Sequence, residues 1–228
     1  SGVKDIVKDA FIPWYNACKF LLQNIEKWES EQNKTFVYRE ITSYDENNNI
    51  MDKWLLSSIQ SLLKFVREEM SYYRLYTVLP RLVKYIDTLC NWYVRLNRKR
   101  LRGETGEDDC FTALNTLYNV LFTMIRLCAA FVPFLTESLY QRMKKYLGEN
   151  ANKLEYASIH YLLVPEPNEK LINLEIEQLV GVMQRVILLG RTIRDRKKLP
   201  LRLPLKELVI LVEDYEDIAN AIVQVRPY

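Results

Sequence analysis

Apolar residues recur every three or four positions through most of the first 198 residues, and this periodicity most constrains the fold. Such spacing predicts helices that bury one face. The chain of 228 residues has only 6 glycines and 8 prolines, so few turns interrupt these helices. We therefore expect a mainly α fold, an antiparallel helical bundle, whose core needs no disulfide or metal ion.

The first helix is expected from Val3 to Ser30, and Pro13 should kink or restart it. Asn49, with Asp52 three residues later, resembles a capping box that begins the second helix. Pro133 should kink or divide a later one. The remaining periodic segments are 51–70, 81–102, 110–147 and 169–196.

The pattern changes after residue 198. Leu205–Val212 is rich in β-branched and aliphatic residues, which predicts a strand, and Asp214–Val225 has a helical pattern. A lone strand and helix cannot bury their faces. We therefore expect a helical bundle over 1–198, followed over 199–228 by a short C-terminal βα piece, the truncated start of a small α/β module.

The sequence carries no pattern typical of an active site. The four cysteines stand too far apart for a zinc knuckle or a redox motif, which favours buried thiols in a reducing compartment. The one histidine, His160, lies in a polar segment, and no glycine-rich phosphate loop or nucleophile elbow occurs. No apolar stretch is long enough to span a bilayer. We expect no catalytic site, no metal, no cofactor and no membrane partner, and a cytoplasmic location.

Positive charge is concentrated in two places, although the net charge is only +3. On a helical wheel at about 100° per residue, one face of the segment 82–102 carries a basic row within roughly 30° of one direction. The opposite face is an apolar stripe of Leu82, Ile86, Leu89, Tyr93 and Leu96. The basic row comprises Asn91, Arg95, Arg98 and Arg102.

Guanidinium groups one helical turn apart, about 5.4 Å, match the phosphate spacing of an RNA strand. Asn91 could hydrogen-bond a base edge, and Trp92, on the flank of the wheel, could stack on an unstacked base. Lys99 and Arg100 would add long-range attraction. The plainer interpretation is a solvated basic face at a helix end, where the macrodipole favours cations.

The second cluster ends the last long helix and comprises Arg191, Arg194 and Lys198. These side chains could also simply complement the helix dipole. We interpret the two clusters together, as the rims of one groove for a polyanion.

Several segments resemble the isoleucyl-tRNA synthetases of the eukaryotic cytosolic type, in the region after their catalytic core. Asn91-Trp92-Tyr93-Val94-Arg95 followed by Arg98-Lys99-Arg100 is similar to a basic motif of that family. The other matching segments are collinear with it and cover nearly the whole chain: 2–17, 51–58, 131–137 and 202–206.

The resemblance implies the helical anticodon-binding domain of a class Ia synthetase, which holds the anticodon stem-loop of tRNA(Ile). Arg95, Arg98 and Arg102 would contact its phosphates, with Asn91 and Trp92 nearest the bases. The nucleotide-binding motif of the family needs two histidines, so ATP would be used only by a catalytic core outside this chain. The implied partners are tRNA(Ile), the rest of the synthetase in cis, and a multi-synthetase assembly. In bacterial relatives aromatic residues often close the basic motif, where this chain has Leu101-Arg102-Gly103.

Two alternatives remain open. Fifteen tyrosines and 4 tryptophans could supply the anchors of a helical protein-interaction scaffold. The same bundle also occurs in the related valyl and leucyl enzymes.

Overall fold

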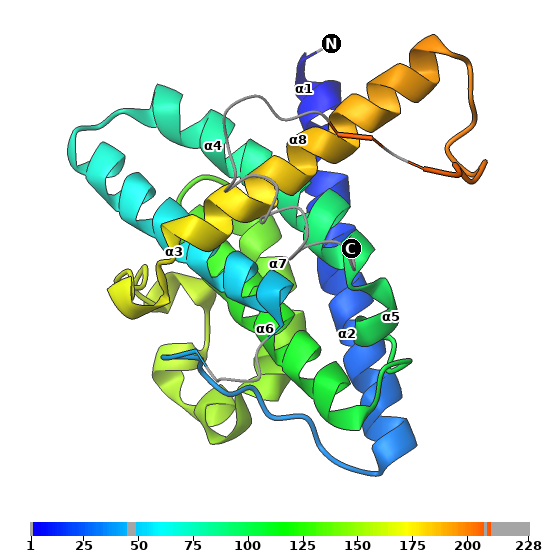
Figure 1. Ribbon diagram of the computed structural model, residues 1–228. Helices are drawn as coiled ribbons and strands as arrows, with labels where there is room; N and C mark the ends of the chain where they lie inside the picture. The colour runs from blue at the N-terminus through cyan, green and yellow to red at the C-terminus, as the bar shows by residue number, and fades with distance from the viewer. Residues whose placement is uncertain (1, 45–48, 208, 211–228) are drawn as a thin grey trace. The chain divides into compact units, whose positions relative to one another are not determined.

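Long helices dominate the computed structural model, which describes residues 2–44, 49–207, 209 and 210 (Figure 1). The chain divides into two compact units, Ser1–Ile172 and Asn173–Tyr228. The longer helices of the first unit are α2 (Ile12–Gln32), α3 (Ile50–Ser71), α4 (Leu75–Thr88), α6 (Glu107–Cys128) and α7 (Pro133–Met143). Its shorter elements are α1 (Gly2–Ile6), α5 (Arg98–Leu101), the π-helical η1 (Val7–Phe11) and η2 (Leu89–Val94), and the 3-10 helices η3 (Lys144–Asn152), η4 (Leu154–Tyr156), η5 (Ile159–Tyr161) and η6 (Glu169–Leu171).

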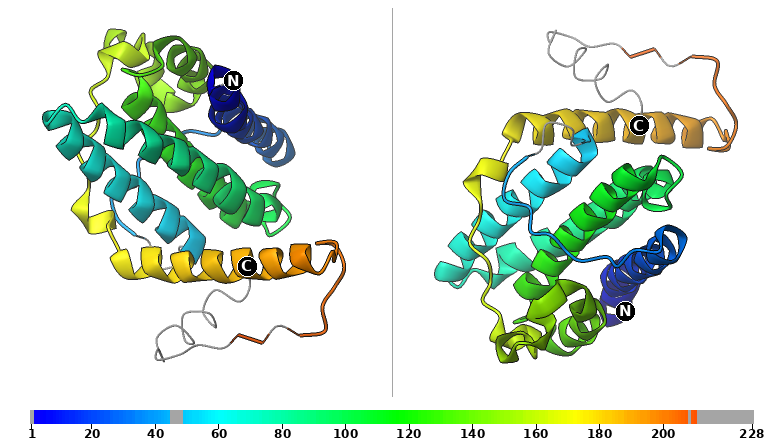
Figure 2. Two further views of the ribbon diagram at one scale, coloured as in Figure 1. Left: turned by 90° about the horizontal axis from the view of Figure 1, so that it is seen from above. Right: turned by 90° about the horizontal axis from the view of Figure 1, so that it is seen from below.

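In the first unit α6 forms the centre of the core, because it contacts α2, α3, α5 and α7. Figure 2 shows it between α2 and α3 in the view from below. The extended segment after α2 packs onto it: the Asn115 side chain exchanges hydrogen bonds of 2.9 and 2.8 Å with the backbone of Arg39. Aromatic rings fill the space between these elements, with the Phe36 ring 5.3 Å from that of Phe111.

The first helix is continuous from α1 through η1 to α2, and Pro13 stands in the first turn of α2. Proline has no N–H, so the α-helical hydrogen bond to the carbonyl of Asp9 cannot form. The π-helical turn Val7–Phe11 lies at this point, and such turns adjust a helix where its regular bonding fails. Pro13 therefore changes the local winding without ending the helix.

The long helices predicted from periodicity are present, with differences of detail. The last one begins at Leu174 and not at Glu169, which lies in the separate 3-10 helix η6. Pro80 lies within α4, as its sixth residue, and does not precede the helix. Its missing N–H removes the backbone hydrogen bond to Tyr76, yet the helix continues to Thr88.

Asn49 caps α3, accepting a hydrogen bond of 2.8 Å from the Met51 N–H. Asp52, however, is not part of a capping box, because its carboxylate is buried against Arg100 and Tyr93.

The second unit contains α8 (Leu174–Arg196). The described residues of the predicted strand, 205–207, 209 and 210, form no strand, so the βα piece is not supported there. The helix predicted over Asp214–Val225 lies outside the described residues. The proposed division at 198 and 199 stays a prediction.

Among the described residues, no helix is both long and apolar enough to cross a membrane.

Candidate nucleic-acid interface

The basic row lies on the surface of the first unit, along η2 and α5. Asn91, Arg95, Arg98 and Arg102 all have exposed side chains. On the opposite face, four residues of the apolar stripe are buried and Leu96 is half-buried. The wheel therefore separated the solvent face from the core face, although the segment is π-helical over Leu89–Val94 and turns at Asn97.

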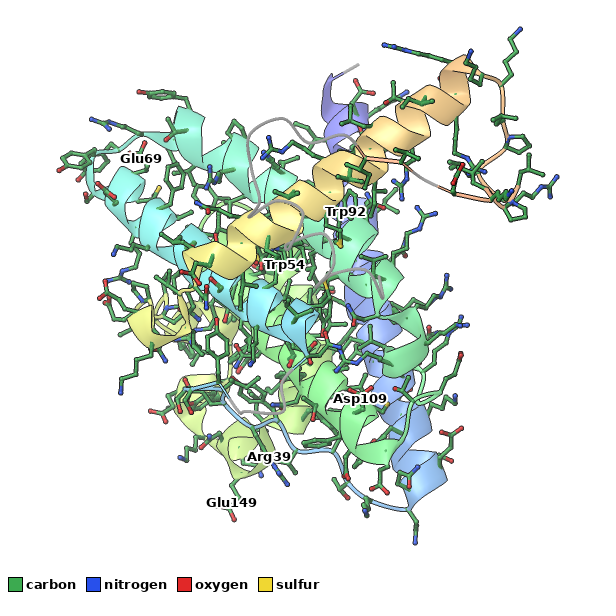
Figure 3. The ribbon with its side chains drawn as sticks, viewed as in Figure 1. Arg39, Trp54, Glu69, Trp92, Asp109 and Glu149 are labelled. Atoms are coloured by element: carbon green, nitrogen blue, oxygen red, sulfur yellow. The ribbon has the colours of Figure 1, made fainter. Side chains whose placement is uncertain are left out.

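A buried ion-pair cluster holds this row in place. The guanidinium of Arg100 donates two hydrogen bonds to the Asp52 carboxylate, of 3.0 and 2.9 Å. It also donates three to Asp109, of 2.6 to 3.0 Å, and one of 2.9 Å to Asn97. Tyr93 adds a hydroxyl donor 2.6 Å from the same Asp52 oxygen that Arg100 Nη1 contacts. Asp52 lies in the first turn of α3, and Asp109, labelled in Figure 3, lies in the first turn of α6. The cluster therefore joins both helix ends to α5.

The charges of this cluster stabilise one another. Partial burial disfavours the charged form of Asp109, but hydrogen bonds from Arg100 and Thr105 lower its pKa below the usual range. Burial also disfavours charge on Arg100, yet its bonds to Asp52 and Asp109 raise the pKa of the guanidinium above its ordinary value. The Asp52 side chain is fully buried, so it depends on these donors for its solvation.

Arg100 therefore has a different role from the one predicted. We expected it to add long-range attraction for RNA, but its side chain is only 9% exposed and its donors point to carboxylates of the core. It anchors the short helix α5, which carries the exposed Arg98 and Lys99 and is followed directly by the exposed Arg102.

Two other predicted residues are less available to RNA than the sequence suggested. The Asn91 amide donates a hydrogen bond of 2.6 Å to Asp87, one turn earlier, although its side chain is exposed. Trp92 (Figure 3) is only 8% exposed, so the prediction that its ring is open for stacking is wrong. The wheel assumed one buried face, whereas η2 contacts both α2 and α3.

A groove lies beside the row, between α2 and η2. Its volume is about 460 Å³, and it is lined by Pro13, Asn16, Ala17, Phe20, Cys90, Val94, Arg95 and Arg98. The Arg98 guanidinium carbon lies 5.8 Å from the centre of the half-buried Phe20 ring. The basic row thus forms one wall of a hollow whose other wall is α2.

Sequence reasoning missed Phe20. The apolar stripe of the first helix passes through Ala17, Cys18 and Leu21, and Phe20 lies at its edge. A large aromatic residue beside a buried stripe was the available signal, but nothing local indicated that Arg98 would lie next to it.

The second basic cluster lies at the end of α8, in the other unit. The Arg194 guanidinium donates hydrogen bonds to the carbonyls of Pro200, Leu201 and Leu203, so it holds the turn after the helix. Lys198 is exposed and Arg191 is half-buried. A groove shared by both clusters stays a prediction.

The described residues contain no group of three or more His, Cys, Asp or Glu that could hold a metal ion. Three of the four cysteines are buried, and burial raises the pKa of the Cys110 thiol to about 11 and that of Cys128 to about 12. At neutral pH these thiols are protonated and poor nucleophiles. His160 is exposed.

A family model for the anticodon-binding domain of tRNA ligases matches residues 52–210. The chain therefore belongs to this family. The match begins at Asp52 of the buried cluster and spans the basic row.

Among the proteins of similar sequence are cytoplasmic isoleucine–tRNA ligases. The chain is 50% identical over 216 residues to a cytoplasmic isoleucine–tRNA ligase of Mus musculus, a match that covers 94% of this chain and 17% of the relative. It is 50% identical over 213 residues to that of Arabidopsis thaliana, covering 93% and 17%, and 44% identical over 233 residues to that of Saccharomyces cerevisiae, covering 98% and 21%. The chain thus spans about a fifth of the length of these curated relatives.

Proposed function

We propose that this chain binds the anticodon stem-loop of tRNA(Ile) as one domain of a cytoplasmic isoleucine–tRNA ligase. The observation that carries the proposal is the exposed row of Arg95, Arg98 and Arg102 beside a groove, in a chain of the anticodon-binding family. The relatives are named cytoplasmic isoleucine–tRNA ligases, which supports isoleucine as the amino acid of the tRNA and the cytoplasm as the location.

The chemistry of the row suits RNA. Arginine can contact a phosphate through two parallel N–H groups, and phosphate contacts fix the position of a nucleic acid without reading its sequence. Specific recognition of RNA uses unstacked loop bases, because the deep major groove of A-form helices hides base edges. In this proposal the row binds the backbone, and neighbouring surfaces contact the bases.

The rest of the ligase supplies the chemistry. The ATP-dependent attachment of isoleucine belongs to a catalytic core outside this chain, which the domain serves by positioning the tRNA. We also propose that Arg191 and Lys198 add to the RNA surface, and that residues 199–228 begin a small α/β module after a bundle over 1–198. No membrane takes part.

The test is binding of this chain to tRNA(Ile), with valine tRNA as competitor, over a range of salt concentrations. Binding that weakens steeply with salt and prefers tRNA(Ile) supports the proposal. Binding that weakens steeply with salt but does not prefer tRNA(Ile) would mean that the row contacts phosphates without contributing to specificity. In that case the chain could equally be the domain of a valyl or leucyl enzyme. Absence of binding at low salt contradicts the proposal.

A second candidate function is protein association, including a multi-synthetase assembly. It is favoured by apolar and aromatic residues exposed at the connection between α3 and α4. These are Tyr72, Tyr73, Leu75 and Tyr76, exposed by 61%, 88%, 47% and 75%. An interface of this kind depends little on salt, so a protein partner that stays bound at salt concentrations that release tRNA would support this second function.

A further inference from the structure

The groove between α2 and η2 combines two kinds of surface. Ala17, Val94 and the Phe20 ring supply apolar walls, and Arg95 and Arg98 supply positive charge at the side of the exposed row. Asn16, exposed on α2, adds an amide that can both donate and accept hydrogen bonds. A nucleotide has the same division, with a flat apolar face, a polar edge and an anionic phosphate.

The two arginines of the groove are available to an anion. In the described part of the chain, neither Arg95 nor Arg98 forms an ion pair with a carboxylate, in contrast to the nearby Arg100. Guanidinium groups without a carboxylate partner, placed beside an aromatic ring, favour a ligand that has both a π face and a negative charge. The ring can stack on the π face while the guanidinium groups bind the charge.

The dimensions also fit. A volume of about 460 Å³ lies within the range of small-molecule sites, roughly 300–1,000 Å³. The Arg98 guanidinium is 5.8 Å from the Phe20 ring centre, farther than the stacking distance of flat groups. Arg98 is an exposed side chain on a flexible stem, so it can turn outward and admit a base against the ring.

We propose that this groove binds a single unstacked RNA base, with the Phe20 ring as its stacking surface and Arg95 and Arg98 on the adjoining phosphates. The proposal rests on the proposed function, since it assumes that the basic row binds an anticodon stem-loop. It assigns to Phe20 the stacking role that the buried Trp92 cannot have.

The experiment uses the anticodon stem-loop of tRNA(Ile) with the fluorescent base 2-aminopurine placed at each loop position in turn. The whole chain is compared with its Phe20→Leu variant, which keeps an apolar side chain but loses the π face. Removing a ring on which one base stacks should weaken binding about ten-fold. We expect one loop position whose fluorescence change on binding disappears in Phe20→Leu, with that loss of affinity and an unchanged salt slope.

Matched variants distinguish stacking on the ring from a general effect of losing a phenylalanine. Phe65 is a half-buried phenylalanine with Arg81 5.0 Å from its ring centre, so Phe65→Leu is a control that should bind as the wild type does. Phe20→Tyr retains the ring and should keep the affinity and the signal. An abasic site at the identified loop position should weaken the wild type about ten-fold and weaken Phe20→Leu no further.

The outcomes separate the two proposals. If wild type and Phe20→Leu bind every loop equally, with equal fluorescence, the base site is overturned while salt-dependent binding still supports the anticodon-binding function. If Phe20→Tyr loses as much affinity as Phe20→Leu, Phe20 acts through packing and the base site is overturned. If the wild type shows no salt-dependent binding, both proposals fail.

Discussion

At the scale of single residues, two arginines two positions apart have opposite environments. Arg98 is exposed beside the groove, whereas Arg100 is buried between Asp52 and Asp109. Replacing Arg98 by Gln should lower the slope of log K against log salt for tRNA by about 0.7 to 1 unit, because one phosphate contact is lost. Lys153→Gln, which removes an exposed charge in the connection between η3 and η4, is the control. Equal slopes for all three proteins would remove Arg98 from the interface.

Loss of Arg100 should affect stability. Arg100→Leu leaves the Asp52 carboxylate buried without its main partner, which costs about 3–5 kcal/mol of the free energy of unfolding. Arg98→Leu, at an exposed position, should cost less than about 0.5 kcal/mol. Urea unfolding followed by circular dichroism measures both, and similar values for the two variants would contradict the structural role of the cluster.

The cluster also predicts a pH dependence. The pKa of Asp109 is lowered in the folded state, so its contribution to stability is complete above the pKa of the unfolded carboxyl, about 3.9, and is lost as pH falls through the lowered folded value. Asp109→Asn should therefore be less stable than the wild type at neutral pH, and the difference should shrink in acid. Unfolding free energies of both proteins from about pH 7 to about pH 2 measure this. A constant difference would mean that the charge of Asp109 does not contribute.

At the scale of elements, the start of α3 carries the buried cluster, so its cap matters to the interface. The Asn49 side chain accepts a hydrogen bond from the Met51 N–H. Asn49→Ala should cost about 1 kcal/mol of stability, while Asn49→Asp keeps an acceptor oxygen and should be close to the wild type. Thermal unfolding of the three proteins tests the cap, and an equal loss in both variants would show that the amide group itself is needed.

Elements were more predictable than their boundaries. The helices followed from apolar period, since each buries a stripe whose spacing is set by helix geometry alone. Pro80 misled the prediction because it lies inside α4, as its sixth residue, where proline removes one interior backbone hydrogen bond without ending this helix. The capping box at Asn49 was half right: the cap forms, but Asp52 turns to a partner that is distant in the chain.

At the scale of the whole molecule, the connection before α8 is attached to α3. Asn168 donates its backbone N–H to the Gln60 side chain at 2.8 Å, and Lys64 pairs with Glu169 at 2.9 Å. The segment after α8, residues 197–207, is exposed throughout. Trypsin should therefore cut first at Lys197, Lys198, Arg202 and Lys206 and more slowly at Lys170. Mass spectrometry of early fragments measures the order, and early cleavage at Lys170 would contradict the attachment of this connection to α3.

The sequence by itself determined the helical class of this protein, the approximate extent of its long helices and the solvent face of its basic row. These follow from the period of apolar residues, which a helix imposes on any chain. Tertiary structure alone decided that Arg100 turns inward, since its partner Asp52 is 48 residues away. It also decided that Phe20 lies beside Arg98 and that Trp92 is buried. A helical wheel describes one helix in isolation, whereas burial depends on every element packed against it.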